Sequence, residues 1–178
     1  MSKDIKNLIA MDISEFNLFC LNRRLIEHIN FNDQTHMRLG SVTDKTAVEQ
    51  LFLDNKIDCI IHCAAYKHVH LLEENPSSAL INNVLGTYVI ASAAARHAAE
   101  KFILISTDKA VNPTSIMGAS KRLCEKLIYE FNKQDIFCKF ALVRFGNVLG
   151  SSGSVIPIFE KQAESGNPVT VTHPDVTR

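Results

Sequence analysis

The chain has 178 residues, of which 46% are hydrophobic and 21% charged, and its 19 basic residues balance its 19 acidic ones. This length and composition predict one globular domain with a sizeable buried core. Without net charge the chain has no bulk electrostatic attraction to nucleic acid or to an anionic membrane, so neither is expected as a partner.

The N-terminal residues lack the apolar segment of a signal peptide, and no apolar run approaches the roughly 18–20 residues needed to cross a bilayer. The five cysteines include no Cys-x-x-Cys pair and are odd in number. We therefore expect a reduced, cytoplasmic chain without a membrane segment. Cys59 and Cys63 flank an apolar strand pattern and are interpreted as small core residues.

Apolar residues alternate between short runs typical of strands and longer runs at helical spacing. The first part of the chain predicts a strand at 8–11 closed by Asp12, a helix at 16–29, a weaker strand at 35–39, a helix at 46–53 and a buried strand at 58–65. The rest predicts a helix from about 75 to 97, a strand at 101–106, a helix at 114–132, a strand at 138–144, a helix at 154–165 closed by Gly166, and a short strand at 169–172. Strands alternating with helices predict one α/β domain with a mainly parallel sheet that helices cover on both faces.

The start of the helix near residue 75 is predicted from Asn75-Pro76, with Asn75 as the capping residue and Pro76 in the first turn. Ligands of such sheets bind outside the carboxyl ends of the strands. Ser106-Thr107-Asp108-Lys109 follows the clearest strand and offers a hydroxyl, a carboxylate and an amine for proton transfer. From position alone, a helix cap with a solvated ion pair explains these residues equally well.

Two further segments are candidates for the same edge of the sheet. Met117 and Lys121 are four residues apart and share one face of a predicted helix, although such a pair is a weak signal by itself. The segment 144–154 carries three glycines and precedes a helix, so it could approach a ligand closely and hold an anionic group, or be only a flexible loop. The histidines have no metal-ligand spacing, so no metal site is expected at these residues: His62, His68, His70, His173.

Several segments together resemble the CapD-type polysaccharide-biosynthesis proteins, extended short-chain dehydrogenases that include UDP-N-acetylglucosamine 4,6-dehydratases. The matching segments are Ala64-Ala65-Tyr66-Lys67-His68-Val69, Glu73-Glu74-Asn75-Pro76, Asn83-Val84-Leu85-Gly86-Thr87, Ser106-Thr107-Asp108-Lys109-Ala110-Val111-Asn112-Pro113-Thr114, Met117-Gly118-Ala119-Ser120-Lys121-Arg122 and Arg144-Phe145-Gly146-Asn147-Val148-Leu149-Gly150-Ser151-Ser152-Gly153-Ser154-Val155. They cover nearly the whole chain in the family's order. The resemblance implies a doubly wound, Rossmann-like NAD(P)-binding domain over residues 1–178, with 145–178 as the start of the substrate-binding part.

The resemblance also implies a reaction, in which NADP (favoured) or NAD takes a hydride from C4 of a UDP-sugar and returns it to C6. Asp108 would protonate the departing C6 hydroxyl, Lys109 would remove the C5 proton, and Thr107 would bind the C4 oxygen. Lys121 would hold the nicotinamide ribose and lower nearby pKa values through its charge. Met117 stands where most short-chain dehydrogenases have tyrosine and cannot transfer a proton. This substitution points to the dehydratase subgroup rather than to an epimerase.

The remaining site residues follow from the same resemblance. The cofactor would be bound by Asp12 at the adenosine ribose, and by Ala64, Ala65, Lys67, Asn83 and Lys121. The nucleotide sugar would be bound by Lys67, Asn147, Ser151 and Ser154.

In the family, a first strand and a glycine-rich turn precede Leu8, and more of the substrate-binding part follows Arg178. In the strand order 3-2-1-4-5-6 the first strand is central, so its absence leaves two facing strand edges without partners, at about 1–3 kcal/mol for each buried unpaired group. We expect an incomplete chain whose sheet closes up, recruits another chain or stays open, and which binds NADP poorly. The alternatives for its function are a non-catalytic remnant, a partner-dependent fragment and a UDP-sugar epimerase. Its possible partners are a complementing chain or further copies of itself in a homo-oligomer.

Overall fold

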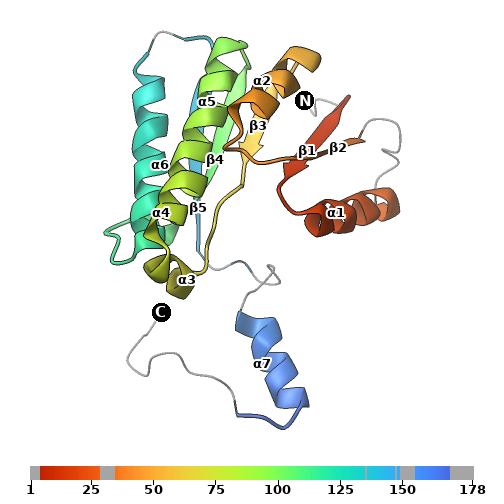
Figure 1. Ribbon diagram of the computed structural model, residues 1–178, viewed down its shortest axis with the longest axis vertical. Coiled ribbons are helices and arrows are strands. Elements are labelled where there is room, and N and C mark those ends of the chain that lie inside the picture. Colours follow the sequence, from red (N-terminus) through yellow and green to blue (C-terminus); the bar gives the residue numbers. More distant parts are fainter. Residues whose placement is uncertain (1–4, 29–34, 135, 147, 149–154, 169–178) are drawn as a thin grey trace. The chain divides into compact units, whose positions relative to one another are not determined.

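The computed structural model describes residues 5–28, 35–134, 136–146, 148 and 155–168. The chain forms two compact units, residues 1–144 and 145–178. The elements, shown in Figure 1, are β1 (Leu8–Asp12), α1 (Glu15–His28), β2 (Thr35–Leu39), α2 (Lys45–Asp54), β3 (Cys59–His62), α3 (Val69–Glu74), α4 (Pro76–Ala79), the π-helix η1 (Leu80–Leu85), α5 (Gly86–Arg96), β4 (Lys101–Thr107), the 3₁₀ turn η2 (Asp108–Ala110), α6 (Ile116–Asn132), β5 (Lys139–Phe145) and α7 (Val155–Glu164).

The predicted alternation of strands and helices is confirmed, and the fold is α/β with parallel strands. The predicted sheet, however, is divided in two: β1 pairs in parallel with β2, and β3 pairs in parallel with β4, beyond which β5 lies. Figure 1 shows the two sheets separately. No backbone hydrogen bond joins β1 to β3 among the described residues.

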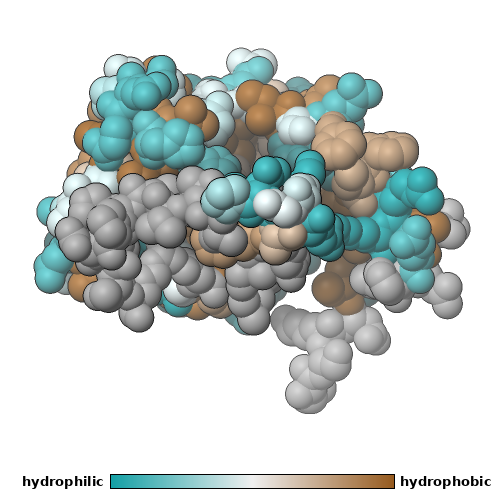
Figure 2. Space-filling model, turned by 90° about the horizontal axis from the view of Figure 1, so that it is seen from below, coloured by the Kyte–Doolittle hydropathy of each residue, from teal (hydrophilic) through white to brown (hydrophobic). Residues whose placement is uncertain are grey.

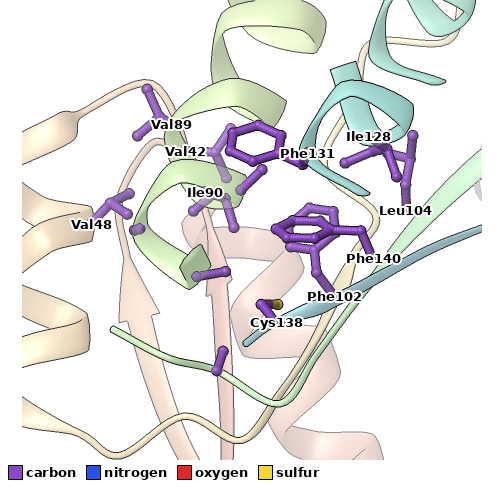
Figure 3. Close-up of a cluster of buried hydrophobic side chains, with 14 of the residues drawn as sticks. Val42, Val48, Val89, Ile90, Phe102, Leu104, Ile128, Phe131, Cys138 and Phe140 are labelled. Atoms are coloured by element: carbon purple, nitrogen blue, oxygen red, sulfur yellow. The ribbon is translucent and has the colours of Figure 1, made fainter. Parts of the chain in front are cut away.

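The main hydrophobic core lies between the strands and one layer of helices formed by α2, α5 and α6. Figure 3 shows Phe102 of β4 beside Phe140 of β5, and their ring centroids are 5.2 Å apart. Phe131 of α6 stacks on Phe140 at 5.0 Å, and Ile128 and Leu104 are almost fully buried beside them. Burying each of these side chains contributes roughly 1.5–3 kcal/mol, so this cluster fixes the helices on the sheet.

The helix predicted from residue 75 to 97 is one continuous helical stretch of three parts, α4, η1 and α5. Asn75 does not cap it with its side chain, because its Nδ2 atom donates to the Leu71 carbonyl oxygen at 2.9 Å. The stretch Pro76–Arg96 is 21 residues long and apolar enough to cross a membrane by length and composition, contrary to the sequence prediction. Half of its apolar window is buried, and its α5 part supplies core residues, which is typical of the core helix of a globular unit.

Two predictions about buried residues were wrong. Cys59 and Cys63 are exposed and not part of the core. The strand predicted at 58–65 is shorter, and Ile61 within it is 63% exposed. The helix α3 was not predicted, whereas α7 and the positive φ of Gly166 agree with the predicted helix and its end. The strand predicted at 169–172 lies outside the described residues.

Candidate functional site

The predicted acid–base residues lie where β4 ends, on the 3₁₀ turn η2. The Thr107 hydroxyl donates to Asp108 Oδ1 at 2.9 Å, and Lys109 Nζ donates to the same oxygen at 3.0 Å. These two hydrogen bonds, that from Lys109 first, lower the pKa of Asp108. In the described residues the three side chains thus form one hydrogen-bonded group, with Asp108 as a carboxylate and Lys109 as its ion-pair partner.

The first turn of α6 packs directly against this group because residue 118 is glycine. A Cβ atom on Gly118 would lie 2.5 Å from the Lys109 carbonyl oxygen, which is closer than real Cβ contacts come. Two side chains cap the same turn: Ser115 Oγ accepts from the Gly118 N–H at 3.2 Å, and Glu73 Oε1 of α3 accepts from the Ile116 N–H at 2.8 Å. These contacts fix the position of the helix that carries Met117 and Lys121.

Lys121 is buried on this helix and directed toward the sheet. Its Nζ atom donates to the Ile105 carbonyl oxygen of β4 at 2.8 Å. Burial lowers the pKa of Lys121, partly offset by Cys124, Cys63 and Glu125. Met117, also predicted, is 5% exposed and packs with Leu72 and Ala79 in a second small core. A lysine with a lowered pKa at the carboxyl end of a strand is typical of a functional group, although structural networks also produce such shifts.

Asn83 holds the segment that follows β3. Its Oδ1 atom accepts from the Tyr66 N–H at 2.8 Å, and its Nδ2 atom donates to the Tyr66 carbonyl at 3.1 Å and to Ser120 Oγ of α6 at 3.0 Å. The amide of Asn83, which is 1% exposed, is therefore fully occupied within the protein. Asn83 therefore positions the segment that follows β3 against α6.

The other residues of this segment for which the sequence predicts cofactor contacts are neighbours of Tyr66 in the chain. Ala64 and Ala65 are half-buried, and Lys67 is exposed. Figure 2, the view from below, shows hydrophilic and hydrophobic residues exposed on the same face.

Asn83 lies in the π-helix η1, a feature often found at functional sites. Its carbonyl oxygen accepts from the Thr87 hydroxyl at 2.6 Å and from Cys124 Sγ at 3.2 Å. The Thr87 hydroxyl uses its proton in the bond to Asn83, so the same hydroxyl oxygen accepts from His62 Nε2 at 3.0 Å. Burial, with Lys121 nearby, lowers the pKa of His62 to about 4, so this histidine is neutral. The interpretation of His62 as structural agrees with this geometry.

Glu125 was missed by the sequence analysis. It is 3% exposed on α6 and accepts from Ser106 Oγ at 2.7 Å, from Arg144 at 2.8 and 2.7 Å, and from Arg122 at 3.0 Å. Burial alone would raise the pKa of Glu125, but the hydrogen bonds from Arg144, Ser106 and Arg122 outweigh it and lower the pKa to about 2. This network ties the ends of β4 and β5 to α6. No local sequence pattern predicts it, because its partners come from separate elements.

Asp12 ends β1, as predicted, and its contacts lie at the start of α1. Its Oδ1 atom accepts from the Ser14 N–H at 2.8 Å, and its Oδ2 atom accepts from Asn17 Nδ2 at 3.5 Å. The predicted substrate-binding residues Asn147, Ser151 and Ser154 lie outside the described residues. Within the described part of the chain, no three histidine, cysteine, aspartate or glutamate side chains are grouped as metal ligands.

Parallel strands joined by helices, with a buried lysine and an aspartate–lysine ion pair near the end of β4, agree with the short-chain dehydrogenase type of fold. The family model for "Polysaccharide biosynthesis protein" matches residues 1–178. The chain belongs to this polysaccharide biosynthesis protein family, which confirms the resemblance to CapD-type proteins.

This chain matches only part of the length of three relatives. The capsular polysaccharide biosynthesis protein CapD of Staphylococcus aureus is 42% identical over 175 residues, which are 98% of this chain and 29% of CapD. The probable polysaccharide biosynthesis protein EpsC of Bacillus subtilis (strain 168) is 49% identical over 158 residues, covering 89% of this chain and 26% of EpsC. A UDP-glucose 4-epimerase of Rickettsia bellii is 34% identical and covers 100% of this chain and 53% of that enzyme.

Solved structures agree with the fold. Pen from Bacillus thuringiensis superposes with a TM-score of 0.86 at 33% identity, covering 94% of this chain and 50% of Pen. A double mutant of DesIV, a dTDP-glucose 4,6-dehydratase from Streptomyces venezuelae solved with NAD and DAU bound, superposes with a TM-score of 0.79 at 18% identity, covering 92% of this chain and 54% of DesIV. The likeness to DesIV shows the fold alone.

Proposed function

We propose that this chain is the catalytic part of a nucleotide-sugar 4,6-dehydratase that acts on a UDP-N-acetylhexosamine of the UDP-N-acetylglucosamine type, for polysaccharide biosynthesis in the cytoplasm. The observation that carries the proposal is the pair Asp108–Lys109, joined at 3.0 Å beside the Thr107 hydroxyl. The overall reaction oxidises C4, eliminates water across C5 and C6, and returns the hydride to C6 and a proton to C5. The elimination therefore needs an acid that acts at C6 and a base that acts at the adjacent C5.

Asp108 and Lys109 supply both functions through one proton. In the ion-paired form the Asp108 carboxylate has no proton to donate, and the Lys109 ammonium cannot accept a proton. Transfer of one proton from Lys109 Nζ to Asp108 produces a carboxylic acid for the C6 hydroxyl and a neutral amine for the C5 proton. The two side chains are now 59% (Asp108) and 33% (Lys109) exposed, which favours the ion pair. A bound sugar that excludes water would favour the neutral pair, because burial disfavours charge.

The residues present fit part of a nicotinamide dinucleotide. A buried lysine amine at the end of β4 suits a ribose hydroxyl, and the half-exposed carboxylate of Asp12 retains acceptor capacity for a second ribose. No glycine stands between residues 1 and 39, so these residues do not form the glycine-rich turn that receives a pyrophosphate. When bound, the nicotinamide supplies the temporary hydride acceptor. NADP in preference to NAD is proposed from the family resemblance alone, whereas the DesIV structure contains NAD.

An epimerase acting on a similar UDP-sugar is the second candidate, because the Rickettsia relative carries that name. Met117 favours the dehydratase, since its thioether cannot exchange a proton with a C4 hydroxyl. A non-catalytic role is the third candidate, because the chain spans only 29% of CapD and 26% of EpsC.

The test replaces the matched 175 residues of S. aureus CapD with this chain and incubates the hybrid and unmodified CapD with UDP-N-acetylglucosamine. We expect a 4-keto product that has lost water and carries a C6 methyl group. Asp108→Asn should abolish the loss of water, whereas Asp54→Asn, which changes an exposed carboxylate of α2, should not. A product that keeps its C6 hydroxyl would establish the epimerase instead. If the hybrid were inactive while unmodified CapD was active, the non-catalytic role would be established.

A further inference from the structure

Helix α6 holds the end of β4 through two side chains on consecutive helical turns. Lys121 Nζ donates to the Ile105 carbonyl oxygen at 2.8 Å, and Glu125 Oε1 accepts from the Ser106 hydroxyl at 2.7 Å. Side chains four residues apart on a helix lie on the same face, so both bonds come from one face of α6. Ser106 lies two residues before Asp108, the first residue of the turn η2, so the end of the strand that leads into this turn is fixed against α6.

The Glu125 carboxylate is itself held by two arginines. Arg144 of β5 donates to both of its oxygens, at 2.8 and 2.7 Å, and Arg122 donates to one of them at 3.0 Å. Glu125 is 3% exposed, and although burial raises its pKa, the hydrogen bonds lower the pKa to about 2. Glu125 is therefore ionised at neutral pH, with both oxygens occupied inside the protein. Such a carboxylate does not serve as an acid, but it holds the groups that donate to it.

Ser106 is the group through which Glu125 reaches the candidate active site. The sequence offered the hydroxyls of residues 106 and 107 for proton transfer, but Ser106 is 4% exposed and donates into the protein. The hydroxyl that reaches Asp108 is that of Thr107, at 2.9 Å. Successive side chains of a strand point to opposite faces, so a Ser106 side chain fixed on α6 also fixes the direction of Thr107.

The other end of the turn contacts the same helix. The first turn of α6 approaches the Lys109 carbonyl oxygen so closely that a Cβ atom on Gly118 would lie 2.5 Å from it. The Lys109 N–H also donates to the Thr107 hydroxyl oxygen at 3.4 Å. The side chain of Asp108 is 59% exposed, so its position follows from the backbone of this turn more than from packing around the carboxylate.

We propose that Glu125 is a positioning residue of the candidate active site, which acts through Ser106 to fix the turn that carries Asp108 and Lys109 against α6. The catalytic consequence rests on the proposed function. Proton transfer needs the acid and the base within hydrogen-bond distance of their target atoms, so a small displacement of the turn slows the reaction. The residues predicted to bind the nucleotide sugar lie in other segments, so loss of the link should lower kcat more than it raises KM.

The first test uses the CapD hybrid with UDP-N-acetylglucosamine, at a temperature at which every variant is folded by circular dichroism. Ser106→Ala removes the donor and leaves both ion pairs of Glu125 in place. We expect kcat to fall about tenfold or more, with KM changed less than about twofold. Glu125→Gln should also lower kcat, and its combination with Ser106→Ala should lower kcat little further, because both changes act through one hydrogen bond.

Arg122→Gln is the matched control for the loss of a Glu125 partner. Arg122 is 46% exposed and lies on α6 itself, so this change removes one ion pair of Glu125 and leaves the bond to Ser106. Both kcat and KM should stay within about twofold of the unmodified hybrid.

A second test needs no activity and uses the 178-residue chain. Hydrogen bonds from Lys109, and then from Thr107, lower the pKa of Asp108, and carbon-13 NMR of its carboxyl group measures this pKa. Ser106→Ala should raise the pKa of Asp108 toward its ordinary value, because a turn released from α6 holds these two donors less closely. Arg122→Gln should leave it unchanged. A residue that only stabilises the fold would not shift this titration while the chain stays folded.

Two results would overturn the proposal. In Ser106→Ala, either an unchanged kcat in an active hybrid or an unchanged Asp108 pKa would mean that the turn is held without Glu125. An equal effect of Arg122→Gln would make a general loss of stability the cause. If the unmodified hybrid were inactive while CapD was active, the proposed function would fail, and the Asp108 titration alone would decide the positioning role.

Discussion

The side-chain amide of Asn83 is hydrogen-bonded to both backbone groups of Tyr66, at 2.8 Å from its N–H and 3.1 Å to its carbonyl. We expect Asn83→Ala to destabilise the chain by about 1–3 kcal/mol, because the Tyr66 backbone groups and the buried Ser120 hydroxyl lose their partner. Urea denaturation measures this loss, and hydrogen exchange should show faster exchange at Tyr66. Asn82→Ala, which removes only a 3.2 Å bond to Asn83 Oδ1, is the control and should have the smaller effect.

Gly118 allows α6 to approach the loop that carries Asp108 and Lys109. Gly118→Ala should destabilise the chain by about 1–3 kcal/mol, because the new methyl group meets the rigid Lys109 carbonyl at 2.5 Å. Gly40→Ala is the matched control, because its Cβ would meet only the flexible end of the Met11 side chain at 2.9 Å. Equal thermal midpoints for the two variants would contradict the importance of the α6 contact.

His62 makes stability depend on pH in the range between its ordinary pKa and its folded value. Its pKa falls from 6.5 to about 4 on folding, so the unfolded chain binds the proton more tightly. The contribution of neutral His62 to the free energy of unfolding is complete above pH 6.5. It is lost as the pH falls toward 4, by at most about 3 kcal/mol. Urea midpoints at pH 7 and pH 5 measure this loss. His62→Gln should flatten the dependence over this interval.

Glu125 makes stability depend on pH in a more acidic range. Its folded pKa of about 2 is below the ordinary 4.5, so the stability that its ionised form contributes is present above pH 4.5 and is lost between pH 4.5 and 2. Glu125→Gln should destabilise the chain by about 1–3 kcal/mol at pH 7, because the 38% exposed side chain of Arg144 loses its bidentate carboxylate partner. Glu130→Gln, which removes an exposed pair with Lys133, should cost less than about 1 kcal/mol in the same urea titration.

Cofactor retention tests whether the 178-residue chain alone holds a dinucleotide. We expect the 178-residue chain to lose NADP during gel filtration, because residues 1–39 contain no glycine from which to form a phosphate-binding turn. The absorbance ratio of the eluted protein measures the bound nucleotide. Retention of one NADP per chain would contradict this prediction.

The sequence by itself determined the order and type of the elements, because side-chain periodicity is a local property. The strand predicted at 35–39 is β2, and the helix predicted at 114–132 contains α6. The hydrogen-bonded group of Thr107, Asp108 and Lys109 was also predictable, since its members are adjacent in the chain.

Only the tertiary structure decided the rest of the site and which surfaces are covered. Asn83 meets Tyr66 and Ser120 across 17 and 37 residues, and Glu125 meets Arg144 across 19, so no local pattern contains these pairs. Cys59 and Ile61 form an apolar strand pattern, yet they are exposed because burial depends on which helix lies over the strand. The handedness and order of the connections fix that covering, and they are properties of the assembled chain.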